Sequence, residues 1–424
     1  MKVLVIGSGG REHAIIRKLA ESPLVDEIIC APGNGGISSQ AVCVNVKATD
    51  IENMKKLARD EEVDFCVVTP DDPLALGMVD ELEAIGVPCF GPDREAARIE
   101  ASKSFSKGLM SKYNIPTADY EIFSEADEAL AYIKERNTYP IVLKADGLAL
   151  GKGVLIIQNE EEAVKAVQQV MVDKTFGDAG NEVVIEEFMT GPEVSVLAFT
   201  DSNVICPMVS SMDHKRANDN DEGLNTGGMG TIAPSPFYTK EIADECMQKI
   251  FLPTMEAMKE EGRPFKGCLY FGLMLTPKGP RVVEYNCRFG DPETQVVLPL
   301  LKTDLFEIMQ AVRYETLGDL DIEWEDGAAA CVIEASGGYP GSYTKGYPIK
   351  GLDADGQCEG VTVYHAGTKK ENDTYYTNGG RVLGITATGK DLKEALHNAY
   401  EGVKAVSFEN MHYRTDIGKK AGNV

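Results

Sequence analysis

One stretch of the chain guides the interpretation of the rest, and it is Val282-Val283-Glu284-Tyr285-Asn286-Cys287-Arg288-Phe289-Gly290-Asp291-Pro292-Glu293. It begins as an apolar run and therefore predicts a strand, on which side chains alternate between two faces. Glu284, Asn286 and Arg288 then form a polar row about 13 Å long, at roughly 3.3 Å per residue. A carboxylate and an amide oxygen in this spacing suit Mg²⁺, which prefers oxygen ligands and is usually shared with substrate phosphates. The planar, permanently charged guanidinium of Arg288 suits a phosphoryl oxygen. The alternative is a polar outer face on an edge strand.

The chain has 424 residues, which is more than one hydrophobic core normally holds, so two to four domains are expected. The hydrophobic fraction of 43% and the charged fraction of 26% are ordinary for a globular protein. Its apolar runs are short, so no membrane-spanning segment is predicted. The first residues already form a strand pattern, so a secretory signal is not expected.

Cysteine usage and charge restrict the class of protein further. The ten cysteines show no Cys-x-x-Cys spacing and predict buried free thiols in a reducing cytosol, and hence a cytoplasmic protein. The five histidines do not cluster, so a zinc site is not expected. The net charge of −25 argues against nucleic acid as a partner. It leaves anionic small molecules possible, because these need only a local pocket of cations and backbone N–H groups.

The first part of the chain predicts a parallel α/β sheet of about 95 residues. A buried strand at Val3–Ile6 leads through Gly7-Ser8-Gly9-Gly10 into a helix, an arrangement that makes an anion site at the helix N-terminus. A dinucleotide fingerprint would need a third glycine where Glu12 stands, which argues against a nicotinamide dehydrogenase. The alternative is that the glycines only permit the turn. Three more strands are predicted at Glu27–Cys30, Phe65–Val68 and Val87–Phe90.

A helical stretch from about Glu95 passes through Ser102-Lys103 and leads to a second α+β region, from Ala118 to about Phe188. Within it, the glycine-rich segment Gly147–Gly153 connects two strands and has a lysine near each end. This segment lacks the Gly-x₄-Gly-Lys-Ser/Thr order of a Walker loop. A mobile loop of this kind can close over a triphosphate, and the alternative is a flexible hairpin.

Further along, no periodic pattern covers Asp213 to Gly230, and long loops inside a domain are usually functional or disordered. The strand ending at Phe188 exits into a hinge that can offer adenine its backbone hydrogen bonds, and Glu193 can accept bonds from ribose hydroxyls. The last region predicts a small sheet-and-helix cap, with a hairpin turn at Asn378-Gly379 and a helix at Leu392–Val406.

These motifs together resemble the phosphoribosylamine–glycine ligases (glycinamide ribonucleotide synthetases), ATP-grasp enzymes of purine synthesis, over essentially the whole chain. The resemblance depends on the stretch around Arg288 and on Gly9–Ala14, Lys144–Ala149, Gly151-Lys152-Gly153, Asp213–Arg216, Asn225–Gly230 and Asn378–Arg381. It implies an α/β and α+β multidomain fold. An N-terminal parallel α/β (pre-ATP-grasp) domain at 1–100 would precede a two-lobed ATP-grasp domain at 101–325. The mobile lid would lie at about 118–188, and a small mixed sheet/helix domain at 326–424.

The resemblance also implies the reaction, in which ATP, glycine and 5-phosphoribosylamine give glycinamide ribonucleotide, ADP and phosphate. Glycine's carboxylate would be phosphorylated first, and the ribosylamine nitrogen would then attack the acyl phosphate. Glu284 and Asn286 would hold Mg²⁺ or Mn²⁺, and the catalytic residues would be Arg288, Asp213 and Lys215. The expected ATP-binding residues are Lys103, Lys144, Gly151, Lys152, Gly153, Glu186, Phe188 and Glu193. The expected substrate-binding residues are Gly9, Gly10, His214, Asn225, Gly228, Asp291 and Arg381. A monomer acting only on small molecules is expected.

The sequence departs from the family pattern at three places. Thr69-Pro70-Asp71 stands where Gly-Pro-Glu is common, and Leu150 replaces an alanine in the lid. The strand at Cys268–Leu275 lacks the metal carboxylate that many ATP-grasp enzymes carry there, which leaves the number of metal ions open. Two alternative functions remain open. One is another ATP-grasp carboxylate–amine ligase acting on a ribonucleotide. The other is a non-catalytic nucleotide sensor, which would be expected to lose Glu284, Asn286 or Arg288.

Overall fold

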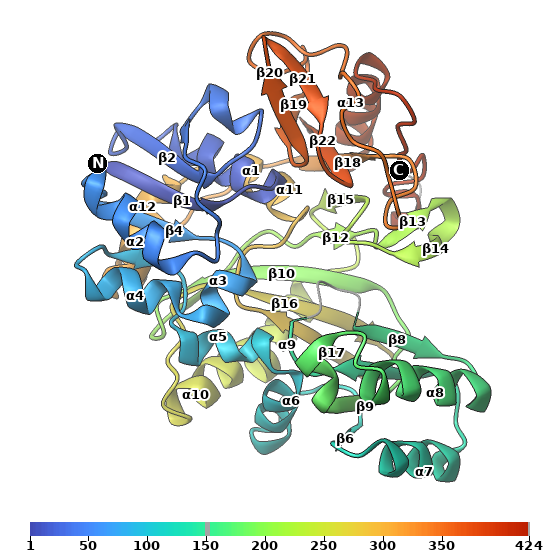
Figure 1. Ribbon diagram of the computed structural model, residues 1–424. Helices are drawn as coiled ribbons and strands as arrows, with labels where there is room; N and C mark the ends of the chain where they lie inside the picture. The colour runs from blue at the N-terminus through green and yellow to red at the C-terminus, as the bar shows by residue number, and fades with distance from the viewer. Residues whose placement is uncertain (149–152, 423–424) are drawn as a thin grey trace.

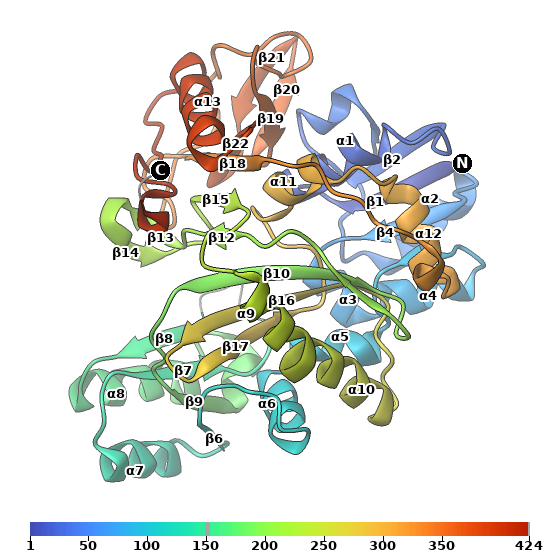
Figure 2. The same cartoon turned by 180° about the vertical axis from the view of Figure 1, so that it is seen from behind.

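The computed structural model describes residues 1–148 and 153–422, in a three-part arrangement (Figure 1). The N-terminal and C-terminal parts lie side by side at one end of the molecule, and a central antiparallel sheet lies below them (Figures 1 and 2). The middle part of the chain, which forms this central sheet, also forms a separate sheet with two helices at the opposite end. No helix among the described residues combines the length and the apolar character needed to cross a membrane.

The N-terminal part is a five-stranded parallel sheet in the order β3-β2-β1-β4-β5, which confirms the predicted parallel α/β architecture. Its strands are β1 Lys2–Gly7, β2 Glu27–Pro32, β3 Val42–Cys43, β4 Phe65–Val68 and β5 Cys89–Phe90. The connecting helices are α1 Gly10–Leu19, η1 Ile37–Ser39, α2 Ile51–Asp60, α3 Asp71–Leu76 and α4 Met78–Ala84. β1 is the buried centre of the sheet because Val3–Ile6 are apolar on both faces.

Two helices, α5 Arg94–Ala101 and α6 Lys103–Lys112, follow the N-terminal sheet. The prediction of one helical stretch through Ser102 was therefore wrong. Ser102 has an extended backbone (φ −134°, ψ 111°), and its side chain accepts a hydrogen bond from Phe105 N. Serine favours such N-cap positions because its hydroxyl satisfies a free backbone N–H.

The region at the far end has its own sheet, in the order β6-β9-β7-β8, and its own hydrophobic core. The strands are β6 Tyr120–Phe123, β7 Ile141–Ala145, β8 Val154–Ile157 and β9 Val183–Glu187. The helical segments are α7 Ala126–Arg136, α8 Glu160–Val167, η2 Gln168–Val172 and η3 Gly177–Asn181. The glycine-rich segment connects β7 to β8, and these two strands pair antiparallel.

The central sheet has the order β11-β10-β16-β17 and is antiparallel throughout. Its strands are β10 Glu193–Thr200, β11 Ile205–Pro207, β16 Gly267–Thr276 and β17 Gly279–Asn286. One face is covered by a continuous helical run, made of α9 Lys240–Cys246, η5 Met247–Phe251 and α10 Leu252–Glu260. A register shift between Gly272 and Leu273 of β16 lies opposite Glu284, so the ladder is irregular where the polar row begins.

The segment predicted as an unpatterned loop, Asp213–Gly230, contains regular structure, so that prediction was wrong. It holds β12 Met212–Asp213, β13 Arg216–Asn218, η4 Asp219–Asp221, β14 Glu222–Asn225 and β15 Gly230–Ala233. β13 and β14 pair as a two-stranded hairpin, while β12 and β15 join the C-terminal sheet. The strands are too short for sequence periodicity to reveal them.

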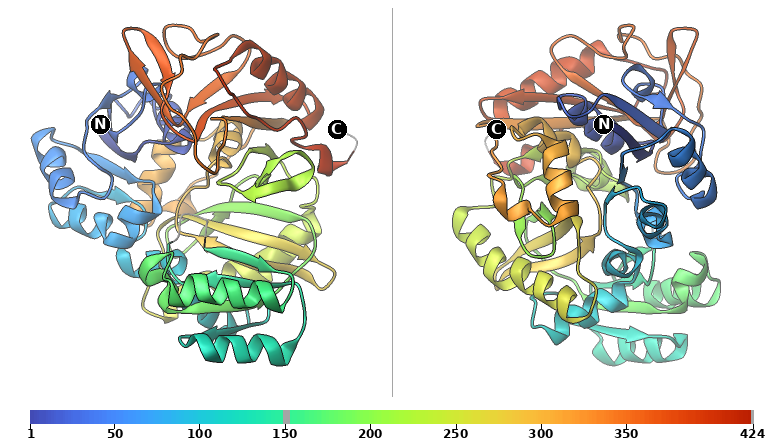
Figure 3. Two further views of the ribbon diagram at one scale, coloured as in Figure 1. Left: turned by 45° about the vertical axis from the view of Figure 1, so that its right-hand side comes forward. Right: turned by 90° about the vertical axis from the view of Figure 1, so that its left-hand side faces the viewer.

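The C-terminal sheet has the order β12-β15-β18-β22-β19 and packs against α13 (Figure 3). Its further strands and the helix are β18 Ala328–Ala335, β19 Thr362–His365, β22 Arg381–Gly389 and α13 Leu392–Ala405. Short segments before and after it are α11 Thr294–Val297, η6 Leu298–Leu300, α12 Leu305–Tyr314, η7 Leu317–Asp319 and η8 Lys419–Ala421.

The predicted hairpin turn at Asn378-Gly379 was wrong. The paired hairpin is β20 Thr368–Glu371 with β21 Thr374–Thr377, and its turn residues Asn372 and Asp373 have positive φ angles of 47° and 63°. Asn378-Gly379 instead leads from β21 into β22, which belongs to a different sheet. Both dipeptides favour tight turns, and the pairing of the strands decided between them.

Candidate functional site

A cavity of about 1040 Å³ lies where the three parts of the chain meet. It is bordered by Arg11 and Asp71 from the N-terminal part and by Arg381 and Lys420 from the C-terminal part. Most of the predicted site residues lie on its wall, namely Lys103, Lys144, Gly153, Glu186, Phe188, Glu193, Asp213, His214, Lys215, Asn225, Glu284, Asn286, Arg288, Asp291 and Arg381. Gly9, Gly10 and Gly228 are not on the wall, and Leu150, Gly151 and Lys152 lie outside the described residues.

The predicted polar row lies at the end of β17. Glu284 and Asn286 pair with Gly272 and Tyr270 of β16, while Tyr285 between them is buried against α10. Among the described residues, no group of three His, Cys, Asp or Glu side chains is placed to hold a metal ion. One carboxylate and one amide oxygen still fit Mg²⁺, because that ion keeps several waters and takes further ligands from substrate phosphates.

Cations surround the Glu284 carboxylate. Burial by itself raises the pKa of Glu284, but Lys215, Lys144 and Lys103 outweigh it and lower the pKa to about 2. The nearest of them is Lys215, whose Nζ lies 3.6 Å from Glu284 Oε1. Glu284 also raises the pKa of Lys215 well above its ordinary value. Glu284 therefore stays ionised at any physiological pH, as a metal ligand must.

Arg288 is held by a residue that the sequence did not single out. Its Nη2 donates a 2.8 Å hydrogen bond to Oε1 of Glu100, a buried residue of α5. Glu100 Oε2 also accepts a 2.8 Å bond from the backbone N–H of Cys287. The Nε–H of Arg288 is buried and has no hydrogen-bond partner within the described chain. The guanidinium is thus fixed at one edge and retains an unused donor.

Three lysines line the cavity on the side of the glycine-rich segment. Lys103 Nζ donates to Gly147 O at 2.7 Å, and Lys144 Nζ donates to Val283 O at 3.0 Å. Lys144 and Lys107 both pair with the buried Glu186 carboxylate, at 3.1 and 3.2 Å. Burial lowers the pKa of Lys107 to about 8, although Glu186 opposes the shift. Sequence reasoning missed Lys107, which carries no motif signal beyond its helical spacing from Lys103.

Another end of the cavity wall holds Asp213, His214 and Lys215, and it adjoins the polar row of β17 through Lys215. Burial raises the pKa of Asp213 well above its ordinary value, and the nearby Glu293 carboxylate adds to the shift. Burial lowers the pKa of His214 to about 4, so its ring is neutral. Its Nδ1 lies 3.0 Å from Gly230 O, and its Nε2 accepts a 3.0 Å bond from Gly418 N–H. Both ring nitrogens of His214 are therefore engaged by backbone groups.

Arg381 and Asp291 form an ion pair at 3.2 Å beside this end. Arg381 Nη1 also donates to the carbonyl oxygens of Gly227, at 2.8 Å, and Asp291, at 2.9 Å. Gly228 lies directly behind Asp213, a residue of the cavity wall. Its φ is +120°, and a Cβ there would lie 2.7 Å from Asp213 Oδ1, so glycine is required at this position.

Gly9 and Gly10 lie behind the wall. Gly9 N–H donates to Glu12 Oε2 at 2.5 Å, and a Cβ on Gly10 would meet Gln295 Nε2 at 2.7 Å. The cavity residue from this turn is Arg11, whose Nε donates to Glu12 Oε1 at 2.7 Å. Thr69, one of the departures from the family pattern, donates to the same Glu12 oxygen at 2.6 Å. The turn is thus braced by Glu12, which occupies the position of a fingerprint glycine.

The described cavity wall carries nine lysines and arginines and ten aspartates and glutamates, so it is close to neutral in a protein whose net charge is −25. Lysines and arginines from four separate segments face a carboxylate–amide pair, an arrangement suited to a polyphosphate with a divalent cation. The wall also continues into a second region around Asp213, with space for a further substrate. Such a site can transfer a phosphoryl group to an acceptor held beside it.

The chain matches three family models over nearly its whole length. The models describe the phosphoribosylglycinamide synthetase N domain (residues 1–100), ATP-grasp (A) domain (residues 101–294) and C domain (residues 329–420). A phosphoribosylamine–glycine ligase of Caldanaerobacter subterraneus subsp. tengcongensis is 49% identical, over 98% of this chain and 99% of that protein. The trifunctional purine biosynthetic protein adenosine-3 of Gallus gallus is also 49% identical, over 99% of this chain and 42% of that protein.

Solved structures agree with these sequence matches. The crystal structure of a phosphoribosylamine–glycine ligase from Thermotoga maritima has a TM-score of 0.84 and 32% identity, over 98% of this chain and all of that chain. A biotin carboxylase domain from Hydrogenobacter thermophilus, at 18% identity and a TM-score of 0.73, shares the fold. The chain belongs to the phosphoribosylglycinamide synthetase family, whose members are ATP-grasp ligases of purine biosynthesis.

Proposed function

We propose that this chain is a phosphoribosylamine–glycine ligase, which joins glycine to 5-phosphoribosylamine and converts ATP to ADP and phosphate. One observation carries the proposal. The Glu284–Asn286–Arg288 row faces three lysines in a cavity that continues into the Asp213–Lys215 region. A phosphate-binding half and an acceptor half are thus adjacent, as a phosphoryl-activated condensation requires.

The reaction proceeds in two steps. Glycine's carboxylate is a poor electrophile, so its oxygen first attacks the γ-phosphorus of ATP, giving glycyl phosphate and ADP. The ribosylamine nitrogen then attacks the acyl carbon, the C–O bond to phosphate breaks, and the nitrogen loses a proton. Charge on the transferring group is stabilised by cations placed in advance. Arg288, oriented by Glu100 and retaining a free Nε–H, supplies such a charge on both the γ-phosphoryl group and the acyl phosphate.

The nucleotide half is assigned as follows. Lys103 and Lys144 contact the α- and β-phosphates, and the segment with Gly151, Lys152 and Gly153 closes over them. Glu186 and Phe188 border adenine, the former through its backbone because its carboxylate is engaged by two lysines. Glu193 accepts hydrogen bonds from the ribose hydroxyls. Glu284 and Asn286 hold Mg²⁺, or Mn²⁺ in its place, which neutralises phosphate charge when bound.

The acceptor half comprises Asp213 and Lys215 as catalytic residues. The residues assigned to glycine and the ribosylamine are Gly9, Gly10, His214, Asn225, Gly228, Asp291 and Arg381. Several of these residues would shape the site through their backbone or by positioning a neighbouring residue, since the side chains of His214 and Arg381 are already bonded to backbone groups. Gly9 and Gly10 shape the turn that presents Arg11 to the cavity.

We also infer domains at 1–100, 101–325 and 326–424, with a lid at about 118–188 that moves relative to the central sheet. The separate core of that region supports this division. One chain supplies both halves of the cavity, which supports a monomer. The ten free thiols support a cytoplasmic enzyme.

The test is ADP release with Mg²⁺, glycine and phosphoribosylamine generated in place, with each substrate omitted in turn. ADP release that requires both glycine and the ribosylamine is the expected result. ADP release with neither, or with a different carboxylate only, would reject the acceptor assignment in favour of another ATP-grasp ligase. ATP binding without any turnover would instead favour a nucleotide sensor.

A further inference from the structure

The hairpin at residues 216–225 forms part of the acceptor half of the cavity but has little hydrophobic support. Arg216, Asp221 and Asn225 line the cavity. Among residues 216–225, all of which the structure describes, only Ala217 is buried, and Leu224 is 66% exposed. Burial of apolar surface therefore cannot fix the position of this hairpin. Its position must depend on polar contacts.

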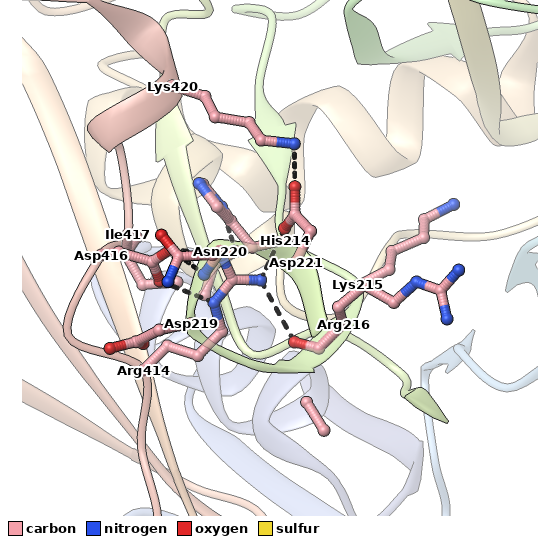
Figure 4. A network of polar contacts seen from close by, with 12 residues as sticks. His214, Lys215, Arg216, Asp219, Asn220, Asp221, Arg414, Asp416, Ile417 and Lys420 are labelled. Atoms are coloured by element: carbon pink, nitrogen blue, oxygen red, sulfur yellow. Dashed lines mark hydrogen bonds and ion pairs between the residues drawn. The ribbon is translucent and has the colours of Figure 1, made fainter. Parts of the chain in front are cut away.

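Those contacts come from residues 412–420, near the end of the given sequence, which we call the C-terminal strap (Figure 4). Its central residue is Arg414, whose side chain is 1% exposed. Arg414 Nη1 donates to Asp221 Oδ1 at 2.8 Å and to Arg216 O at 3.2 Å. Its Nε and Nη2 donate to the two oxygens of Asp416, at 2.8 and 3.0 Å. One guanidinium thus bonds β13, the η4 segment that connects β13 to β14, and its own segment.

Backbone groups extend this attachment along the strap. Asp416 Oδ2 accepts from Asn220 N–H, and Asp219 Oδ1 accepts from Thr415 N–H, each at 2.8 Å. Gly418 N–H donates to Nε2 of His214, as described above. Lys420 pairs with Asp221 and itself reaches the cavity wall. In Figure 4 the Lys215 and Arg216 side chains extend away from the strap.

The charged character of this contact indicates a positioning role. Burying a guanidinium carries a large desolvation penalty, and a buried ion pair is on average no more stabilising than apolar residues of the same volume. What the ion pair adds is direction, because planar Arg–carboxylate bonds fix relative geometry. The strap bonds the hairpin at residues 216–225, and the same hairpin lines the acceptor half of the cavity.

We propose that the C-terminal strap is a positioning element for the acceptor substrates, with Arg414 and Asp416 holding the 213–225 segment so that Asp213, Lys215 and Arg216 face glycine and the ribosylamine. This inference rests on the proposed function. It predicts that damage to the strap weakens use of the acceptors more than use of ATP, because Lys103 and Lys144 bond Gly147 O and Val283 O and not the strap. A purely structural role predicts fewer folded molecules with unchanged Michaelis constants.

The test compares variants in steady-state kinetics of the full chain. Arg414→Met should raise KM for glycine or the ribosylamine about tenfold, with KM for ATP within about twofold, and Arg414→Lys should restore part of the loss. Asp219→Ala removes an exposed strap contact and keeps the test valid if Arg414→Met does not fold. Its expected effect is about threefold on the same constants. Asp391→Ala, which removes the N-cap of α13 in the same part of the chain, is the matched control and should leave all three constants unchanged.

Acceptor constants that stay within about twofold of the wild type in Arg414→Met and Asp219→Ala would overturn the inference. Backbone amide hydrogen exchange provides a second readout that needs no substrate. The amides of residues 216–225 should lose protection in the Arg414 and Asp219 variants and keep it in Asp391→Ala, and equal protection in all of them would also overturn the inference. If the wild type lacks ligase activity, the proposed function fails, while the exchange data still decide whether the strap holds the hairpin.

Discussion

Glu100→Gln tests whether a buried residue of α5 orients Arg288, for which we propose a catalytic role. The Glu100 side chain is 7% exposed, and its two oxygens accept from Arg288 Nη2 and from Cys287 N–H, both at 2.8 Å. Glutamine has the same shape but offers one oxygen and one NH₂ group. Because both neighbours are donors, one of them must face N–H in the variant. The charge that holds Arg288 is lost in either orientation.

The expected magnitude follows from that loss. Removing one partner of a buried ion pair costs about 3 kcal/mol. Each 1.36 kcal/mol added to the activation free energy lowers the rate tenfold. If the whole loss of about 3 kcal/mol raises the activation free energy, kcat falls about 150-fold. If half of it does, kcat falls about tenfold. We therefore expect kcat to fall between these limits, while KM for ATP changes by less than about threefold, since the lysines proposed to contact the phosphates are untouched.

The assay is ADP release at saturating glycine and ribosylamine, with thermal unfolding measured on the same samples. Glu95→Gln is the matched control, because it makes the same substitution five residues earlier on α5, where Glu95 pairs at the surface with Arg263. Exposed pairs contribute about 0–1 kcal/mol, so this control should retain full kcat. A folded Glu100→Gln variant with kcat within about twofold of the wild type would refute the view that Glu100 orients Arg288.

Three further predictions concern other residues of the chain. Arg288→Ala should lower kcat more than it raises KM for ATP, and equal effects on both would show that Arg288 serves ground-state binding only. Glu284→Gln should raise the Mg²⁺ concentration needed for half-maximal activity about tenfold or more, because one of two protein ligands loses its charge; an unchanged Mg²⁺ titration would remove Glu284 from the metal site. Glu334→Gln should change how stability depends on pH. Burial raises the pKa of Glu334 well above its ordinary value, and neither oxygen has a partner among the described residues. The folded protein therefore keeps a proton that the unfolded chain releases above about pH 4.3, so wild-type stability falls as pH rises through this range. The Tm of the variant relative to the wild type should increase between about pH 5 and pH 8, and a constant difference would contradict the assignment.

Local sequence pattern was sufficient for the elements that define the fold. The apolar run at Val3–Ile6, with glycines after it, predicted the central parallel strand, because both signals lie within a few residues of each other. The alternation in Val282–Arg288 predicted that Glu284 and Asn286 share a face, and β17 places both on the cavity wall. The hairpin at 216–225 escaped prediction because its strands are exposed and short, so no apolar period marks them.

The sequence by itself determined the N-terminal parallel α/β units, the polar row of β17 and the family resemblance, since each depends on residues that are neighbours in the chain. The tertiary structure alone decided that Glu100 orients Arg288 across 188 residues and that Gly418 engages His214 across 204. It also decided that the C-terminal strap contacts the hairpin at 216–225. Sequence periodicity does not predict hydrogen bonds and ion pairs of this kind, because their partners lie on elements that are far apart in the chain and close in space. Sequence pattern thus predicts on which face of a strand or helix a side chain lies, and only the tertiary structure determines which residues that face contacts.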